Sequence, residues 1–540
     1  MNFLAALQAG VTPDINFGLI LPEMIVAGMA VVVMLLDAFI RPSQRWTTGG
    51  LSLVGLAGGA AACIWLWMRG SAGAGTFNGM IVLDEIRLSF TLVVILVSAL
   101  TILLSIVWVE TERLPAGEFH SLLLFATSGM MLMASGGDLV IIFLGLEILS
   151  IATYVMCGFR RTDLRSNESS LKYFILGSFS SAFLLYGMAL VYGATASVRG
   201  AGVMAGTTNI AEIGQRVVSG DIMYPALLFA GAAFMLVGFG FKIATAPFHV
   251  WTPDVYEGAP TPVTAFMAAG PKAAGFASFL RVFIFGFPFV GAVTSGTASA
   301  TNVHEAWLHA LAILAIITMS VGNVAAIVQN NVKRMLAYSS IAHAGYALVG
   351  FVAAGAATDA AQRTDALAAV AFYMLAYAVM NLGAFAVVTI IARQNDRRTE
   401  VEDYNGIGFR APALSFTLSI FLLSLLGMPL TAGFIGKVAV FASALNVGST
   451  TPAANSLYTM MVVIGVLNTA ISAYYYLRLI IVMFFRERTT PWAVPHVPAS
   501  IALLLVITIL GVFYLGLFPG RVLDAFKRKP AGSAVTQITR

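Results

Sequence analysis

Long apolar stretches dominate this sequence and determine the solvent in which it can fold. Fourteen of them follow one another along 540 residues, most near the roughly 20 residues that a helix needs to cross a bilayer. They are 19–39, 51–68, 88–108, 121–135, 139–158, 173–192, 224–248, 263–285, 306–328, 335–354, 366–391, 414–444, 457–485 and 501–518. None alternates apolar and polar residues as the strands of a membrane barrel do. The sequence therefore predicts an all-α polytopic membrane protein with about 14 transmembrane helices.

Composition excludes a water-soluble enzyme. Charged residues make up 10% of the chain and the mean hydropathy is +0.89, whereas soluble proteins carry roughly 25% charged residues. The net charge of +5 is not gathered into a basic patch with interleaved aromatics, so no nucleic-acid partner is expected. The two cysteines, Cys63 and Cys157, lie in separate apolar stretches without ligand spacing. We therefore expect no metal, iron-sulfur cluster or other cofactor in this chain.

Lysine and arginine are unequally divided between alternate loops. The loops after odd-numbered stretches hold fourteen of them, and those after even-numbered stretches hold six. Because cytoplasmic loops are enriched in basic residues, both termini are predicted outside, in the periplasm of a bacterial inner membrane. A basic tail opposes this bias, with Arg521, Lys527, Arg528, Lys529 and Arg540.

Several charged residues lie within the predicted spans rather than in loops. Glu147 stands nine residues beyond Asp138, about 13 Å into the bilayer, and Lys242, Lys272 and Lys437 are similarly deep. A charge at a helix centre costs about 2.5 to 3.5 kcal/mol even on the lenient insertion scale, so such residues usually serve function. A structural ion pair remains the alternative for Glu147 alone.

Other charged residues near the spans have plainer explanations. Lys172 is expected to reach the membrane interface, and Glu23 and Asp37 to lie at the ends of the first span. Arg478 is open to two interpretations, as a functional charge or as a cation in helix packing.

Two predicted spans are interrupted. Pro247 follows Lys242 in the seventh span, and Gly427 and Pro429 precede Lys437 in the twelfth. Broken helices are tolerated at membrane depth where they are buried in protein or line a watery cavity. Their separation by five spans predicts two inverted five-helix repeats. The expected divisions are three N-terminal helices (1–120), a first repeat (121–286), a second repeat (304–486), and a last helix with a short basic tail (497–540).

The segment around the first break resembles a known family. GFGFK at 238–242, PFHVWTPDVYEGAPTPVTAF at 247–266 and GPK at 270–272 are similar to the signature of the antiporter-like membrane subunits of respiratory complex I, the NADH-quinone oxidoreductase. About 22 residues follow Phe518, too few for the lateral helix of the distal subunit, and the middle subunit usually has glutamate where this chain has Lys437. YFILGSFSSA at 173–182 and LNTAISAYYYLR at 467–478 resemble the subunit N branch, the counterpart of mitochondrial NADH dehydrogenase subunit 2.

The resemblance implies proton translocation driven by electron transfer from NADH to quinone in partner subunits. Those partners would hold FMN, iron-sulfur clusters and quinone, and would include neighbouring antiporter-like subunits. Glu147, Lys242, Lys272 and Lys437 would form the proton pathway, with Glu147 as counter-ion of Lys242 and Lys437 as the terminal site. His249 and His343 are weaker candidates for relays, since histidine titrates near neutral pH.

Two other classes of transporter share these features. A secondary transporter for an organic solute would also show broken helices and charges at the midplane, although lysines in successive spans suit a relay better than a single substrate site. A subunit of a multisubunit cation/proton antiporter is the closer alternative because it has the same fold. Redox chemistry in this chain lacks support, since the sequence contains neither a dinucleotide-binding motif nor cluster ligands.

Overall fold

Helices account for nearly all of the regular structure. The computed structural model describes residues 15–40, 46–69, 73–199, 203–288, 298–392, 394–450, 455–488 and 496–528. Every predicted span coincides with a helix or a pair of helices. These are α2 (Leu21–Asp37), α3 (Trp46–Arg69), α4 (Glu85–Thr111), α5 (Ala116–Ser135), α6 (Leu139–Cys157), α7 (Leu164–Ala194), α9 (Pro225–Lys242), α11 (Thr261–Gly286), α12 (Ala298–Ile327), α13 (Val332–Ala356), α14 (Ala360–Ala392), α16 (Pro412–Leu426) with α17 (Ala432–Thr450), α18 (Asn455–Phe485) and α19 (Ala499–Leu517).

Twelve helices among the described residues are long and apolar enough to cross a membrane by length and composition alone. The remaining two predicted spans, α5 and α11, have 20 and 26 residues, which is also sufficient length. Their hydropathy is lower because α5 contains Glu118 and His120, while α11 contains Lys272 and Arg281. The all-α polytopic fold predicted from the apolar stretches is thus confirmed.

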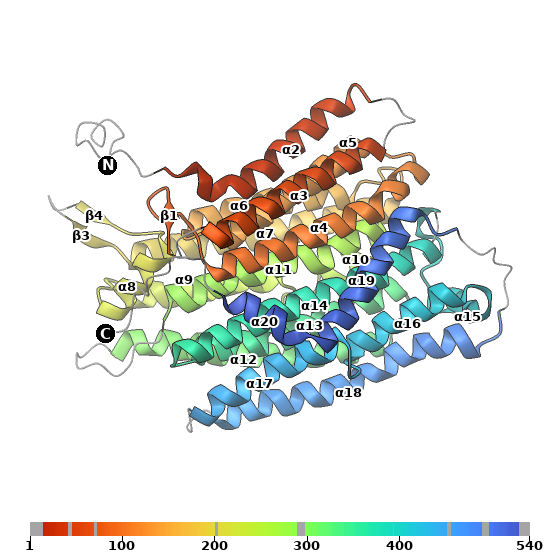
Figure 1. Ribbon diagram of the computed structural model, residues 1–540. Coiled ribbons are helices and arrows are strands. Elements are labelled where there is room, and N and C mark those ends of the chain that lie inside the picture. Colours follow the sequence, from red (N-terminus) through yellow and green to blue (C-terminus); the bar gives the residue numbers. More distant parts are fainter. Residues whose placement is uncertain are drawn as a thin grey trace.

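The long helices lie side by side along one common direction, and most of the short elements gather at their ends (Figure 1). At one end stand two antiparallel hairpins and the amphipathic α8 (Ile210–Ser219). The hairpins are β1 (Gly75–Thr76) with β2 (Ile81–Val82) and β3 (Ser197–Arg199) with β4 (Val203–Ala205). At the other end lies α15 (Ile407–Arg410). The remaining short elements are η1 (Phe17–Ile20), α10 (Thr252–Gly258), η3 (Gln394–Asp396), η4 (Val401–Tyr404) and α20 (Pro519–Lys527).

The two interrupted spans run in opposite directions. α9 runs toward the end of the bundle at which α16 begins (Figure 1). After α9 the helix is interrupted and the chain continues as α10, and after α16 it is interrupted and continues as α17. An inverted repeat requires such antiparallel breaks. The boundaries of the repeats, 121–286 and 304–486, stay a prediction.

Ion pairs join several loops at the end of the bundle that carries α15. Arg160 bridges Asp396 and Glu112, each at 2.9 Å, and Lys333 lies 3.2 Å from Asp396. Asp396 also accepts a hydrogen bond from the backbone of Thr261, at the start of α11. Burial alone would raise the pKa of Asp396, but the charges of Lys333 and Arg160 outweigh it and lower that pKa to about 2. The cluster therefore fixes the start of α11 against the loop after α14.

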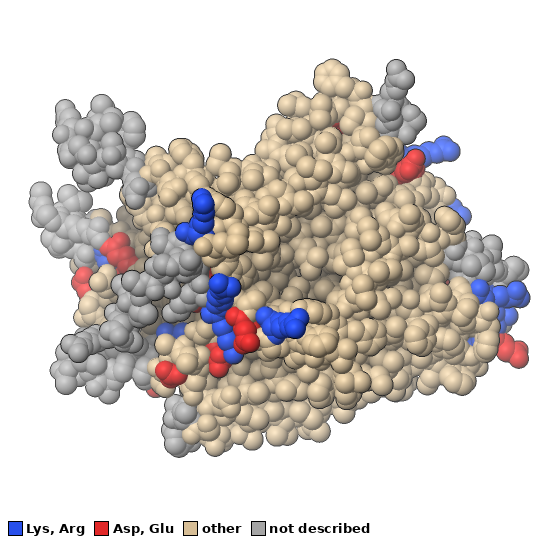
Figure 2. Space-filling view, in the orientation of Figure 1, with Lys and Arg blue, Asp and Glu red and all other residues tan. Residues whose placement is uncertain are grey.

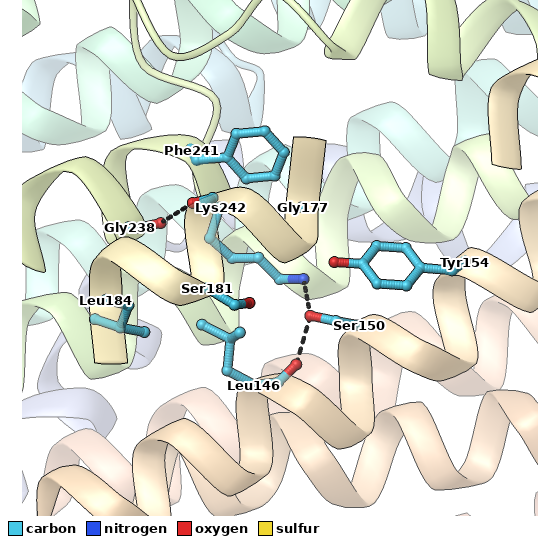
Figure 3. A pocket seen from close by; sticks show the side chains of 10 residues that line it. Leu146, Ser150, Tyr154, Gly177, Ser181, Leu184, Gly238, Phe241 and Lys242 are labelled. Carbon is cyan, nitrogen blue, oxygen red and sulfur yellow. Dashed lines mark hydrogen bonds between the residues drawn. The ribbon is translucent and has the colours of Figure 1, made fainter. Parts of the chain in front are cut away.

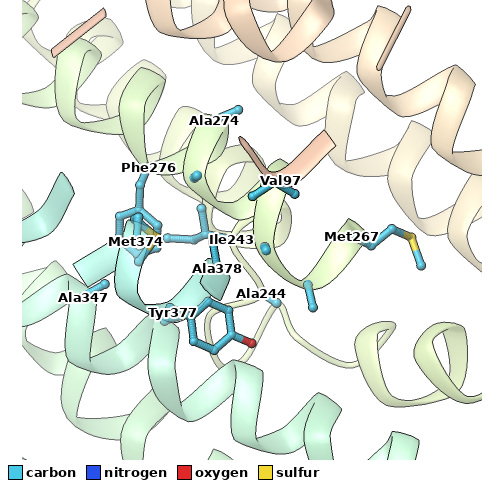
Figure 4. Packing of buried hydrophobic residues seen from close by; sticks show 14 of the residues in the cluster. Val97, Ile243, Ala244, Met267, Ala274, Phe276, Ala347, Met374, Tyr377 and Ala378 are labelled. Atoms are coloured by element: carbon cyan, nitrogen blue, oxygen red, sulfur yellow. The ribbon is translucent and has the colours of Figure 1, made fainter. Parts of the chain in front are cut away.

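The first break is packed inside protein. Ile243 lies close to Phe276 of α11 and Met374 of α14, and Ala244 lies closer to Tyr377 of α14 (Figure 4). Both residues of the break are fully buried. This burial explains how irregular backbone survives at membrane depth, because the neighbouring helices shield it from lipid.

The face of the molecule in Figure 2 is largely uncharged between the two ends of the helices. The exception is a mixed cluster of charges over α20, where Lys527 pairs with Asp365 of α14 at 2.8 Å. α20 therefore folds back against α14, and this accounts for part of the basic tail predicted from the sequence. Lys529 and Arg540 lie outside the described residues.

Candidate functional site

Lys242 is the last residue of α9 and its side chain is buried, with 4% of the residue exposed. Its Nζ donates to the hydroxyl of Ser150 on α6 at 2.9 Å and approaches the hydroxyl of Tyr173 on α7 at 3.5 Å. A small pocket lined by residues of α6, α7 and α9 lies beside it (Figure 3). The lysine thus sits at a junction of three helices with hydroxyl partners.

Glu147 stands one turn before Ser150 on α6 and is partly buried. The ammonium of Lys242 bonds to Ser150 and not to this carboxylate. One carboxylate oxygen of Glu147, Oε1, is buried and has no hydrogen-bond partner among the described residues. Among the described residues, Glu147 and Lys242 do not form a salt bridge, although the two charges lie within electrostatic range of each other. The expected counter-ion pair is thus close but not in contact.

The backbone groups released by the first break find new partners. The indole of Trp251 donates to the carbonyl of Phe241 at 3.1 Å, and the backbone nitrogen of Ala246 donates to Thr318 of α12 at 3.0 Å. Pro247 has no N–H to satisfy. The break around Lys242 is therefore held by both halves of the bundle, since Thr318 belongs to the predicted second repeat.

Lys272 follows Pro271 in the middle of α11 and is 2% exposed. Its ammonium donates to the carbonyl oxygen of Ser340 on α13 at 2.5 Å and to the hydroxyl of the same residue. The buried hydroxyls of Tyr256 and Tyr377 lie near Ser340 but form no hydrogen bond with any described residue. Ser340 is thus the point at which Lys272 of the first predicted repeat meets the second.

His343 lies one turn beyond Ser340 on α13 and is 2% exposed. Its Nδ1 contacts the hydroxyl of Tyr373 at 2.7 Å, and its Nε2 contacts the hydroxyl of Tyr476 at 3.3 Å. The charges of both Lys272 and Lys437 act on its ring. Both ring nitrogens have hydroxyl partners, so the imidazole can accept a proton on one side and donate on the other.

Lys437 stands on α17, just after the second break, and is 4% exposed. Gly427 begins this break in a left-handed conformation (φ 99°), which ends α16 and turns its last carbonyls toward the lysine. The ammonium donates to the carbonyl oxygens of Leu425 (3.3 Å) and Leu426 (2.9 Å). A cation at a helix C-terminus is favoured by the helix dipole, so the break stabilises the lysine that follows it.

The structure thus brings Lys272, His343 and Lys437 into one buried cluster between α11, α13 and α17. Lys242 stands beside the same α11, because Gly275 of that helix lies against the Lys242 side chain. His249 belongs to the segment between α9 and α10, is only partly buried, and forms no hydrogen bond through Nδ1 with any described residue.

Lys172 and Arg478 have partners that fit the plainer explanations. Lys172 is 40% exposed and pairs with Glu168 and Asp254, and Arg478 donates to carbonyls at the end of α12. Glu23 was expected at the end of the first span, and it lies in the first turn of α2. It is 5% exposed and paired with Arg87 at 2.9 Å, because α4 and α2 together enclose both charges.

The sequence did not single out the hydroxyl partners of the site. These are Ser150, Tyr173, Ser340, Tyr373 and Tyr476. Serine and tyrosine are common in membrane helices, where serine usually bonds to its own helix backbone and tyrosine often lies at the interface. Serine and tyrosine residues near the predicted charges could have indicated these partners, but there are too many of them to identify which ones contact the lysines.

Comparison with known proteins gives a consistent result. The family model described as NADH:quinone oxidoreductase/Mrp antiporter, TM, matches residues 136–472. NADH-quinone oxidoreductase subunit N of Trichlorobacter lovleyi is 43% identical over 510 residues, covering 94% of this chain and 96% of the relative. A chain of respiratory complex I from Thermus thermophilus with bound aureothin is 34% identical, with a TM-score of 0.71 and coverage of 94% and 99%.

A chain of the Mrp complex from Dietzia sp. DQ12-45-1b is also similar. It has a TM-score of 0.72 with coverage of 95% of this chain and 97% of that one. Its identity is 18%, so this similarity concerns the fold alone.

Proposed function

The chain belongs to the family of NADH-quinone oxidoreductase subunit N, the antiporter-like membrane part of a proton-translocating enzyme complex, and we propose that its buried lysines form the proton path. The path comprises Glu147, Lys242, Lys272 and Lys437, with His343 between the last two lysines. His249 keeps a weaker place in the proposal, as an accessory group next to the first break.

One observation carries this proposal, the buried cluster around α13. Lys272 bonds to Ser340 of that helix, His343 follows one turn later, and the charge of Lys437 acts on the imidazole. Hydroxyl groups flank both nitrogens of the histidine. Hydroxyls and imidazole can each donate and accept a proton, so these groups can pass a proton between ammonium sites along the membrane plane.

The path can be switched by electrostatics. A lysine in a poorly hydrated interior holds its proton better when an opposite charge is near and releases it when another cation approaches. Glu147 provides the opposite charge near Lys242, and its partly buried position leaves it accessible to a neighbouring subunit. A change of charge in that neighbour would therefore alter the proton affinity of Lys242.

The proposed function requires partner subunits and a defined orientation in the membrane. Partner subunits hold FMN, iron-sulfur clusters and quinone and transfer the electrons, and neighbouring antiporter-like subunits contact this chain in the membrane. Both termini lie on the periplasmic side of the bacterial inner membrane. The even number of spans and the bias of basic residues toward alternate loops support this orientation.

The test compares lysines in the assembled complex. Lys242→Ala and Lys437→Ala should lower the number of protons pumped per NADH oxidised, measured in inverted membrane vesicles, because each interrupts the relay. Lys172→Ala removes an ion-paired lysine at the edge of the membrane and should leave that ratio unchanged. A normal ratio in both assembled Lys242 and Lys437 variants would remove the proposed path, and Glu147→Gln tests the carboxylate in the same assay.

A further inference from the structure

The ammonium of Lys437 is held without a carboxylate. Its partners are the carbonyls of Leu425 and Leu426 and the aromatic face of Tyr346, whose ring centroid lies 4.7 Å from Nζ. Lysine ion pairs elsewhere in the described chain belong to Lys172, Lys333 and Lys527. Within the same residues, no acidic group comes within 4.0 Å of Lys437.

The ring of Tyr346 is fixed from several sides. Its hydroxyl accepts a hydrogen bond from the side-chain amide of Asn323 on α12 at 3.0 Å, and Asn323 accepts one from Tyr475 on α18 at 2.9 Å. The ring packs edge-on against His343 at 5.7 Å and Phe441 at 6.1 Å. Tyr346 is 1% exposed. Its face is therefore oriented toward the lysine before any charge is placed there.

We propose that Tyr346 is a positioning residue for proton transfer, whose aromatic face stabilises protonated Lys437 in place of a carboxylate counter-ion. The inference rests on the proposed role of Lys437 as a proton site. An aromatic face attracts a cation through the ring quadrupole, most strongly when both are removed from water. The carbonyl ends of α16 add their share of the helix dipole.

Neutral partners suit a site that must both hold and release a proton. A carboxylate would form a tight ion pair and would itself compete for the proton, whereas the face of a tyrosine ring and backbone carbonyls attract the cation without taking its proton near neutral pH. Lys242 differs, since its Nζ lies 5.7 Å from the ring of Tyr173 and within range of Glu147. The two lysines beside the breaks are therefore stabilised by different means.

The helices packed around α17 carry the other groups that can titrate near Lys437. They are His343 and Tyr346 on α13, Tyr373 and Tyr377 on α14, and Tyr475 and Tyr476 on α18. α16 has no titratable side chain, and Tyr514 of α19 is 44% exposed. Histidine is the one group among these that could be confused with Lys437 in a pH profile, because tyrosines titrate near pH 10 or above.

The experiment changes the ring electronics while keeping its shape. Position 346 of the full chain in the assembled complex is replaced by Phe, by phenylalanines carrying one to three ring fluorines, and by Leu. Fluorine withdraws electron density from the face of the ring, and leucine has no such face. Proton pumping by inverted vesicles is then measured as a function of pH, together with NADH oxidation.

Tyr346→Phe should keep the wild-type profile, because the face is retained and only the hydroxyl is lost. The high-pH limb of pumping should move to lower pH with each added fluorine, and by roughly half to one and a half pH units in Tyr346→Leu. A merely structural role for the tyrosine would give no graded shift with fluorination. If the leucine variant does not assemble, the fluorinated variants, which nearly keep the shape of the ring, still test whether Tyr346 stabilises protonated Lys437.

Identical pH profiles across the fluorinated series would overturn the inference. So would a shift that disappears in a His343→Gln background, since the limb would then belong to the histidine. Lys437→Ala separates this inference from the proposed function. A normal proton ratio in that variant removes both, whereas a lowered ratio combined with unshifted fluorinated variants removes only the role of Tyr346.

Discussion

At the scale of single residues, Asp396 is the carboxylate that two buried cations, Arg160 and Lys333, share. Asp396→Asn should lower the free energy of unfolding by about 2 to 3 kcal/mol at neutral pH, because Lys333 loses its carboxylate and Arg160 loses one of two. Its pKa of about 2 lies below the unfolded value near 4. The stabilisation is therefore complete above about pH 4 and is lost as the pH falls toward 2.

Thermal unfolding of the purified complex at a series of pH values checks this. The difference in midpoint between the wild type and Asp396→Asn should stay constant from about pH 7 to about pH 4 and shrink below it. Asp163→Asn is a suitable control, since the partner Arg165 is exposed and asparagine can still cap the start of α7 as Asp163 does. Equal midpoints for the wild type and the Asp396 variant at neutral pH would show that the cluster contributes nothing to stability.

The sequence could reveal the charges of the site because each is expensive in a membrane. Lys242, Lys272 and Lys437 were identifiable for this reason, and the structure buries all three. Their partners were not identifiable in the same way, because contacts such as Lys272 with Ser340 join residues 68 positions apart. The contact of Tyr346 with Lys437 could not be predicted either, since nothing near Tyr346 in the sequence indicates that its ring faces this lysine.

At the scale of elements, the break between α16 and α17 depends on the left-handed Gly427. A residue with a side chain costs about 1 to 2 kcal/mol in this conformation. Gly427→Ala should therefore lower the unfolding midpoint and reduce proton pumping per NADH, because relieving the strain moves the Leu425 and Leu426 carbonyls away from Lys437.

Gly427→Asn is the matched variant for this test. Asparagine enters the left-handed region more readily than alanine, so it should lose less stability and less pumping. Both measurements can be made on the same vesicles used for the lysine variants. An alanine variant that keeps the wild-type proton ratio would show that the geometry of this break is not needed at the terminal lysine.

The long helices were predictable because apolar length is a strong signal. The short elements were not, as α8, α20 and the two hairpins are too brief to form a long apolar stretch. Helix ends also differed, since α7 begins at Leu164 while the apolar stretch begins at residue 173. The first turns of α7 are polar and are held instead by contacts such as that of Ser169 with the carbonyl of Val255.

At the scale of the whole molecule, charge and topology assign the two ends of the bundle to opposite sides of the membrane. The end with Arg160, Arg161 and Arg334 carries the basic loops, whereas Asp365 stands near the other end. An orientation with both termini in the periplasm places Arg161 in the cytoplasm and Asp365 outside. The side chains of Arg161 and Asp365 are 77% and 58% exposed.

Single cysteines at these two positions test the orientation directly. The native Cys63 and Cys157 are both buried and should stay silent toward a membrane-impermeant thiol reagent. Asp365→Cys should be labelled in cells whose outer membrane is permeabilised, and Arg161→Cys only in inverted vesicles. Both substitutions remove exposed ion pairs of small energetic value, so the fold should persist. Labelling of the two positions from the reverse sides would invert the topology, and with it the side to which Lys437 releases its proton.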